Sequence, residues 1–197
     1  MAYFRYANKL KKDDEPNYLR KWDFTKSLTD EIAGKTIDIQ NVYEWTPENG
    51  IYIKESNNYF EFTTGIGFNE KNWVIEIDVG ESNMTSNRDG RFVMRTNEKS
   101  YNTPTGFVYR YVNGTHYWSM CNGYGWQDNY MEQDGQIFNN KTLRLVNNSG
   151  VIEIFANNTK VDEFPDGDYR EIYIGNKGNA FCPVYIKAIR TYYIENE

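Results

Sequence analysis

Hydrophobic and polar residues alternate along several short segments of this chain. The clearest alternation covers residues 73–79, where apolar side chains hold every odd position and Glu76 and Asp78 hold two of the even ones. Successive side chains of a strand point to opposite faces of a sheet, so this period of two places the apolar residues on one face. The pattern predicts a strand with one buried face and one solvated face.

Further short segments show the same strand-like character, and turn-forming residues separate them. The predicted strands are Gly50–Lys54, Tyr59–Phe62, Gly90–Arg95, Gly106–Val112, His116–Met120, Thr142–Val146, Val151–Phe155, Glu171–Ile174 and Pro183–Arg190. The predicted turns are Asn57–Asn58, Asn113–Gly114, Asn148–Gly150, Asn157–Asn158 and Asp166–Gly167. Asn57–Asn58 is expected to join its two flanking strands in a hairpin. Roughly ten to twelve short strands without a helical pattern predict an all-β fold, a two-sheet antiparallel β-sandwich.

The chain of 197 residues suits one domain of ordinary size. Residues 1–20 differ from the rest, because the basic residues Lys9, Lys11 and Lys12 precede an acidic run and Pro16 without any periodicity. We expect residues 1–20 to form an N-terminal arm or linker and residues 21–197 to form the sandwich. Both a disordered tail and a tether to a partner fit the composition of the arm.

Composition and charge narrow the classes of function. Aromatic residues make up 17% of the chain, including seventeen tyrosines, which favours two-faced sheets and binding surfaces. The net charge is −6 and the basic residues are scattered, so nucleic acid is not expected as a partner. We find no apolar run long enough for a membrane span or for the core of a signal peptide.

Metal-binding and cysteine motifs are weak. Cys121 and Cys182 lack metal-ligand spacing, and two buried free thiols are expected, with a disulfide left open. The lone His116 is expected in a strand and cannot form a metal site by itself. Asp128, Asp134 or backbone carbonyls could hold calcium, but no loop has the spacing of a calcium site, and so no cofactor is predicted.

The order of several segments resembles the concanavalin A-like lectin/glucanase (laminin-G-like) jelly-roll domains. The segments that carry this resemblance are Trp22–Asp30, Gly50–Phe62, Trp73–Val79, Leu143–Val146, Val151–Val161, Ile172–Gly175 and Ile186–Tyr193. They cover residues 22–193, nearly the whole chain. The resemblance implies a jelly roll that encounters extracellular glycans or other proteins, although one such fold serves lectins, glucanases, adhesive modules and virion proteins.

One acidic motif resembles the active-site signature of the laminarinase-type glycoside hydrolases that share this fold. The similarity implies Glu76 as nucleophile, Asp78 as modulator and Glu81 as acid/base of a retaining endo-β-glycoside hydrolase. Gly80 departs from that signature, because an apolar residue usually precedes the last Glu. The competing interpretation, which we favour, has Glu76 and Asp78 solvated on the outer face of an ordinary strand, with Gly80 and Glu81 beginning a turn.

A second segment combines aromatic rings with amides and carboxylates, the mixture that sugar sites use. We expect ligand-binding residues in a Gly-rich loop and its flanks at the rim of the sandwich, although the same rings could simply close the end of the core. The candidates are Trp118, Tyr124, Trp126, Asp128 and Tyr130.

Fold and location together predict a function. A lectin-like domain behind a charged arm resembles accessory capsid, tail or baseplate proteins of phages, which are made in the cytoplasm and displayed on the particle. We therefore expect a non-catalytic virion surface protein with carbohydrate or host-surface binding, anchored to other virion proteins through residues 1–20. The alternatives are the hydrolase that uses Glu76 and Glu81 and a purely structural assembly module; homo-oligomers fit either virion role.

Overall fold

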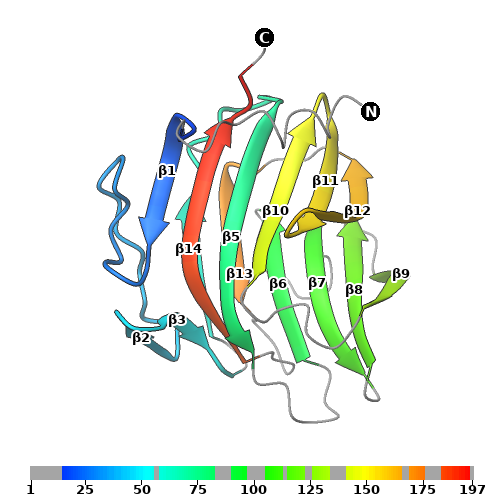
Figure 1. Ribbon diagram of the computed structural model, residues 1–197, viewed down its shortest axis with the longest axis horizontal. Coiled ribbons are helices and arrows are strands. Elements are labelled where there is room, and N and C mark those ends of the chain that lie inside the picture. Colours follow the sequence, from blue (N-terminus) through cyan, green and yellow to red (C-terminus); the bar gives the residue numbers. More distant parts are fainter. Residues whose placement is uncertain are drawn as a thin grey trace.

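The computed structural model of the protein consists of two antiparallel sheets packed face to face (Figure 1). It describes the backbone of residues 15–55, 58–82, 90–96, 105–112, 115–122, 126–133, 141–165, 169–175 and 183–195, and the side chains of these residues outside 82–133, 161–162 and 164–165. The described strands are β1 (Tyr18–Asp23), β2 (Glu44–Thr46), β3 (Gly50–Ile53), β4 (Tyr59–Thr63), β5 (Trp73–Ser82), β6 (Gly90–Thr96), β7 (Thr105–Val112), β8 (Thr115–Asn122), β9 (Trp126–Gln133), β10 (Lys141–Asn148), β11 (Val151–Ala156), β12 (Thr159–Pro165), β13 (Glu171–Gly175) and β14 (Val184–Tyr193). The all-β sandwich predicted from the sequence is confirmed. None of the described residues form a helix with the length and apolar character needed to cross a membrane.

The larger sheet has eight strands, in the order β12-β11-β10-β5-β14-β3-β2, with β1 also paired to β14. Its centre is the long pair β5–β14, whose register places Ile77 opposite Ile189. Tyr18 of β1 pairs with Tyr192, so residues 18–20 belong to the sheet although the sequence pattern placed them in the arm. The first and last described strands therefore lie side by side (Figure 1).

The smaller sheet has six strands in the order β4-β13-β6-β7-β8-β9. β3 and β4 lie in different sheets, so the predicted hairpin across residues 57–58 is wrong. β3 buries Ile51 and Ile53 beside β14, whereas β4 buries Phe60 and Phe62 beside β13. Each of the two segments has an apolar face that must be covered, and placing them in opposite layers buries both faces against one core.

The hydrophobic pattern did not predict four of the strands, β1, β2, β9 and β12. β2 has only three residues, and β9 has the mainly polar sequence WQDNYMEQ without a clean alternation. Two of the predicted turns are confirmed. Ser149 and Gly150 join β10 to β11 with φ angles of 57° and 98°, and Asn157, with φ 53°, begins the turn between β11 and β12.

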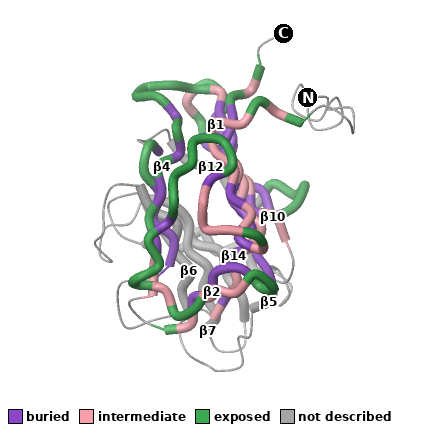
Figure 2. Tube along the Cα trace, turned by 90° about the vertical axis from the view of Figure 1, so that its left-hand side faces the viewer, coloured by how far each residue is buried: buried purple, intermediate pink, exposed green. Residues whose placement is uncertain are grey.

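Aromatic side chains from the two sheets meet in the core. Trp22 of β1 packs edge-to-face on Phe62 of β4 with ring centroids 5.3 Å apart, and Phe24, just after β1, packs on Phe60 at 5.9 Å. All four side chains are buried. Figure 2 shows this buried layer between the two sheets and exposed segments around it. The core therefore joins the first strand of the larger sheet directly to the edge strand of the smaller one.

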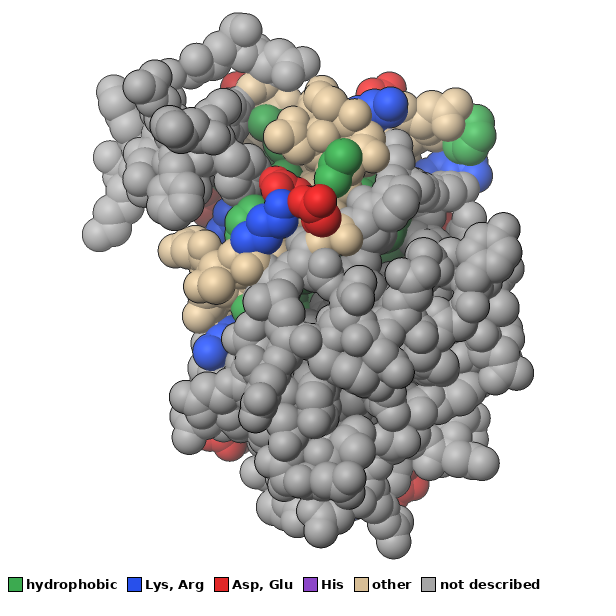
Figure 3. Space-filling view, turned by 90° about the vertical axis from the view of Figure 1, so that its right-hand side faces the viewer, with side chains coloured by type: hydrophobic (Ala, Val, Ile, Leu, Met, Phe, Trp, Pro, Cys, Tyr) green, Lys and Arg blue, Asp and Glu red, His purple; other side chains and the backbone are tan. Residues whose placement is uncertain are grey.

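Charged side chains protect the edge of the larger sheet at β12. Lys160 pairs with Glu153 and Glu163, both at 2.6 Å. Figure 3 shows acidic and basic side chains next to one another on this side of the molecule. Charges on an edge strand discourage pairing with the strand of another molecule.

A glycine in β13 should be required for the pairing of β13 with β4. Gly175 has φ 121°, and a Cβ added there would lie 2.3 Å from the backbone oxygen of Asn58. We expect Gly175→Ala to lower the free energy of unfolding by at least about 2 kcal/mol, because backbone must move to admit the methyl group. Gly34→Ala is the matched control, since Gly34 also has a positive φ, 66°, but has open space around it. Urea unfolding would measure both variants, and equal losses would contradict the steric explanation.

Candidate functional site

The acidic strand that resembled a hydrolase signature is held by arginines on the outer face of the larger sheet. Arg190 donates from Nε to Glu76 at 3.0 Å and from both terminal nitrogens to the two oxygens of Asp78 at 2.8 Å. Arg144 forms an ion pair with Glu76 at 3.3 Å, and Tyr192 donates its hydroxyl to the same carboxylate. Both carboxylates are thus engaged by protein groups.

Strand register explains this cluster. Glu76 lies directly opposite Arg144 on β10 and Arg190 on β14. Burial, and then the charge of Glu76, raise the pKa of Tyr192. Burial lowers the pKa of Arg190, but its hydrogen bonds and ion pairs with Asp78 and Glu76 outweigh that effect, so its pKa lies above the usual value. Glu76 and Asp78 lie on the outer face of the strand as expected, but their side chains are 15% and 30% exposed and are paired with arginines.

Glu81 does not join this network among the described residues. β5 continues to Ser82, so the turn predicted at Gly80 and Glu81 is wrong. Between its pairs with Ile186 and Val184, β5 has one residue more than β14, which makes a bulge at Gly80 and Glu81. Glu81 is exposed there.

The predicted sugar-binding residues lie largely outside what the structure describes. Trp118 is in β8, and β9 contains Trp126, Asp128 and Tyr130, but their side chains are not described. The expectation that this segment is a rim loop is therefore wrong for β9, whereas its role in binding stays a prediction. Tyr124, Asp134 and Cys182 lie outside the described residues, and the backbone places Cys121 and His116 in β8. Within the described part, no group of three or more His, Cys, Asp or Glu side chains could hold a metal ion.

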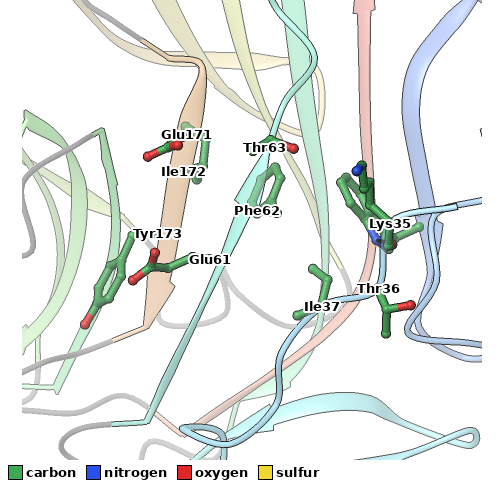
Figure 4. Close-up of a pocket in the computed structure, with 10 residues that line it drawn as sticks. Lys35, Thr36, Ile37, Glu61, Phe62, Thr63, Glu171, Ile172 and Tyr173 are labelled. Atoms are coloured by element: carbon green, nitrogen blue, oxygen red, sulfur yellow. Dashed lines mark hydrogen bonds between the residues drawn. The ribbon is translucent and has the colours of Figure 1, made fainter. Parts of the chain in front are cut away.

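A pocket of about 270 Å³ lies along β4, at the opposite edge of the smaller sheet from β9. We call it the edge pocket. It is lined by Trp22, Lys35, Thr36, Ile37, Glu61, Phe62, Thr63, Glu171, Ile172 and Tyr173. Figure 4 shows Glu61, Glu171 and Tyr173 on one side of the paired strands β4 and β13, with Ile37 and Thr36 across β4 from them. The lining therefore combines buried apolar side chains with exposed charged and hydroxyl groups.

Pairing and alternation bring the β4 and β13 residues of the pocket together. Thr63 lies opposite Glu171, Phe62 opposite Ile172 and Glu61 opposite Tyr173. In β4, Glu61 and Thr63 are exposed while Phe62 between them is buried in the core. The alternation of β4 was visible in the sequence, but its pairing with a strand about 110 positions later was not.

Asp30 organises the loop that supplies Lys35, Thr36 and Ile37. Its carboxylate accepts hydrogen bonds from the backbone nitrogens of Lys21 at 2.8 Å, Ile32 at 3.0 Å and Ala33 at 2.9 Å. The backbone nitrogen of Asp30 donates to the carbonyl of Lys35, which also accepts from Nε1 of Trp22. Because Asp30 is buried, these bonds are shielded from water, and the loop is fastened to β1.

A second pocket of about 340 Å³ adjoins the edge pocket and shares Thr63 and Glu171 with it. We call it the arginine pocket. Its lining consists of Arg20, Thr63, Gly65, Ile66, Arg170 and Glu171. Thr64, which is buried next to the lining residue Thr63, donates its hydroxyl to the carbonyl of Tyr169 at 2.8 Å and so links the two segments that line this pocket. Glu76, Asp78 and Glu81 line neither pocket.

Solved structures with a similar fold include lectin-like domains. The botulinum neurotoxin serotype D ligand binding domain in complex with N-acetylneuraminic acid has a TM-score of 0.60 and 14% identity over 91% of this chain. The exoplasmic/lumenal domain of VIP36 in its Ca²⁺/Man3GlcNAc-bound form has a TM-score of 0.55 and 11% identity over 88% of this chain and 90% of its own. This chain spans 48% of the botulinum domain. At such low identities the likeness shows the fold alone, a lectin-like β-sandwich.

No protein-family model matches the chain, and no curated protein matches it in sequence.

Replacing Glu76 should affect stability. We expect Glu76→Gln to lower the free energy of unfolding by about 2 kcal/mol, because Arg190 and Arg144 lose the charge that compensates them. Glu81→Gln, at an exposed residue, should change it by less than about 0.5 kcal/mol. Urea unfolding of both variants tests this difference. If Glu76→Gln left the free energy of unfolding unchanged but abolished a measurable glycosidase activity, the result would instead favour the hydrolase.

The loop of the edge pocket should depend on Asp30. We expect Asp30→Ala to lower the free energy of unfolding by about 3 kcal/mol, since three backbone N–H groups lose their charged acceptor. Asp38→Ala is the control, because Asp38 accepts one hydrogen bond, from Gln40, at an exposed site. Chemical denaturation measures both effects. A loss at Asp30 no larger than that at Asp38 would show that the loop is held by other contacts.

Proposed function

We propose that this protein binds a glycan at the edge pocket and does not cleave it. The observation that carries the proposal is the lining of this pocket. Lys35, Glu171 and the hydroxyls of Thr36 and Thr63 can bond sugar hydroxyls, and the apolar wall behind them, in which Phe62 is 6% exposed, keeps this part of the pocket non-polar. Its volume of about 270 Å³ suits one sugar ring better than a long oligosaccharide.

The fold supports the proposal without specifying the ligand. The VIP36 domain, which this chain matches over most of both lengths, is described in a Man3GlcNAc-bound form. The botulinum domain is described with N-acetylneuraminic acid, but its chain is about twice as long as the part matched here. Carbohydrate binding therefore accompanies this fold in other proteins, and the ligand of this chain has to come from its own side chains.

The arginine network supports a role without catalysis. A retaining hydrolase needs a nucleophile and an acid/base about 5 to 5.5 Å apart in a sugar cleft. Glu76, the nucleophile of that alternative, is instead engaged by Arg190, Arg144 and Tyr192 on a sheet face. Neither Glu76 nor Glu81, its acid/base, lines a described pocket. We therefore infer that the carboxylate of Glu76 stabilises the sheet.

Display on a virion surface is a further part of the proposal. It is supported by the charged composition of residues 1–20. In this proposal the residues that precede β1 contact other virion proteins and the sandwich faces outward. A purely structural assembly module is the alternative, and it predicts no glycan binding.

Glycan-array binding of the purified protein, run beside a reducing-sugar release assay on mixed β-glucans, tests the proposal. We expect selective binding without sugar release. Glu171→Ala should weaken binding about tenfold, because it removes an acceptor in the edge pocket, whereas Glu48→Ala, at an exposed residue outside both pockets, should not.

Three outcomes would contradict this proposal. Absence of binding to every glycan on the array would favour the purely structural assembly module. Sugar release that disappears in Glu76→Gln would establish the hydrolase. If Glu171→Ala left glycan binding unchanged, the binding site would lie outside the edge pocket. The aromatic candidates of β8 and β9 would then be the next residues to test.

A further inference from the structure

The arginine pocket differs in chemistry from the edge pocket that it adjoins. Its lining carries two guanidinium groups, those of Arg20 and Arg170, against the one carboxylate of Glu171. Thr63 and Glu171 line both pockets, so the two pockets are adjacent and one ligand can contact both. The two pockets together have a polar part for hydroxyls and a cationic part.

Arg20 is held in place by the protein at one side of the arginine pocket. Its guanidinium lies against Gly65, where an added Cβ would be 3.3 Å from both Cζ and Nη1. Nη1 donates to the carbonyl of Leu19, and Nε is 3.7 Å from Asp30. Among the described residues this buried Nε makes no hydrogen bond. Asp30, whose carboxylate also accepts three backbone N–H bonds, forms an ion pair with this guanidinium and holds it beside the pocket.

Arg170 is positioned by an aromatic ring at the other side of the arginine pocket. Its guanidinium carbon lies 4.7 Å from the centroid of Phe68. The backbone carbonyl of Arg170 accepts a hydrogen bond from the backbone nitrogen of Thr64, which fixes the strand end that carries this side chain. Residue 170 is exposed and lines the arginine pocket.

Two positioned guanidinium groups at one concave site are suited to an anion, because their N–H forks match planar oxyanions and form charge-assisted hydrogen bonds. We propose that the arginine pocket binds the negatively charged group, a carboxylate or a sulfate, of an acidic sugar whose ring lies against the edge pocket. The inference rests on the proposed function and specifies its ligand class. Glu171, shared by both pockets, accepts hydrogen bonds from the hydroxyls of the same sugar.

Titration of the isotope-labelled full-length protein with matched sugars, followed by NMR, tests the proposal. The probes are the methyl glycosides of glucose and glucuronic acid, those of galactose and galacturonic acid, and lactose with its 3′-sialyl and 3′-sulfo derivatives. We expect at least one acidic probe to bind about tenfold more tightly than its neutral partner and to shift the backbone amides of Gly65 and Ile66. Raising the NaCl concentration from about 50 mM to about 500 mM should weaken the binding of the acidic probe and leave that of the neutral probe unchanged.

Two variants separate recognition of charge from loss of fold. Arg170→Gln, at an exposed position, should reduce affinity for the acidic probe about tenfold and leave affinity for the neutral one within about twofold. Arg20→Lys keeps the positive charge that faces Asp30 but removes the planar guanidinium with its paired N–H donors. We therefore expect a lower affinity for the carboxylate probes and an unchanged midpoint of unfolding. Lys71→Gln removes a positive charge outside both pockets and should change neither affinity.

The possible results lead to different conclusions. Tighter binding of carboxylate or of sulfate probes, lost in Arg170→Gln, supports the proposal and identifies which anion is recognised. Equal binding of acidic and neutral sugars overturns it and leaves glycan binding at the edge pocket intact. Equal shifts with acetate or inorganic sulfate overturn it as well, because the pocket would then bind anions without a sugar. Absence of binding by every probe refutes glycan binding itself.

Discussion

Packing of Trp22 and Phe24 against Phe62 and Phe60 is the interaction on which the rest of the structure depends. It is the contact between the first strand of one sheet and the edge strand of the other. The residues of both pockets are neighbours of this contact in sequence or in space. Arg20 lies two positions before Trp22, Thr63 directly follows Phe62, and Nε1 of Trp22 donates to the carbonyl of Lys35. A core that fixes these rings therefore also fixes the polar groups around them.

The protein uses charged side chains in two contrasting ways. On the outer face of the larger sheet, Glu76 and Asp78 have cross-strand partners that satisfy them, so this cluster adds cohesion between β10, β5 and β14. At the edge of the smaller sheet, Lys35, Glu171 and Arg170 line two adjoining pockets. Glu76 and Asp78 line neither pocket, and this difference in position distinguishes the stabilising cluster from the proposed site.

The edge position of β4 makes such a site available. An edge strand has one side without a neighbouring strand, and proteins usually cover or charge it. Here the backbone nitrogen of Tyr59 donates to the carbonyl of Asn41, and the loop that carries Lys35 and Thr36 lies alongside. That loop is fastened through Asp30 to β1. The cover of the edge and one wall of the pocket are thus the same segment.

The sequence by itself determined most of the strands, their buried faces and the sandwich architecture. The alternation over residues 73–79 and the hairpin turns at Ser149–Gly150 and Asn157 are local, because pleating and the left-handed backbone conformation act on a few neighbouring residues. An acidic strand, by contrast, looks the same whether its carboxylates are solvated, catalytic or paired. Only the register shows that Arg190 and Arg144 lie opposite Glu76.

The tertiary structure alone decided where the candidate site lies. Residues 35–37, 61–63 and 171–173 carry no shared motif, and they meet because β3 and β4 part into different sheets and β13 returns beside β4. Such contacts between distant segments depend on how all the apolar faces are covered at once. The local pattern of hydrophobic and polar residues therefore predicts the layers of this protein, whereas the composition of its pockets follows from strand pairing across more than a hundred residues.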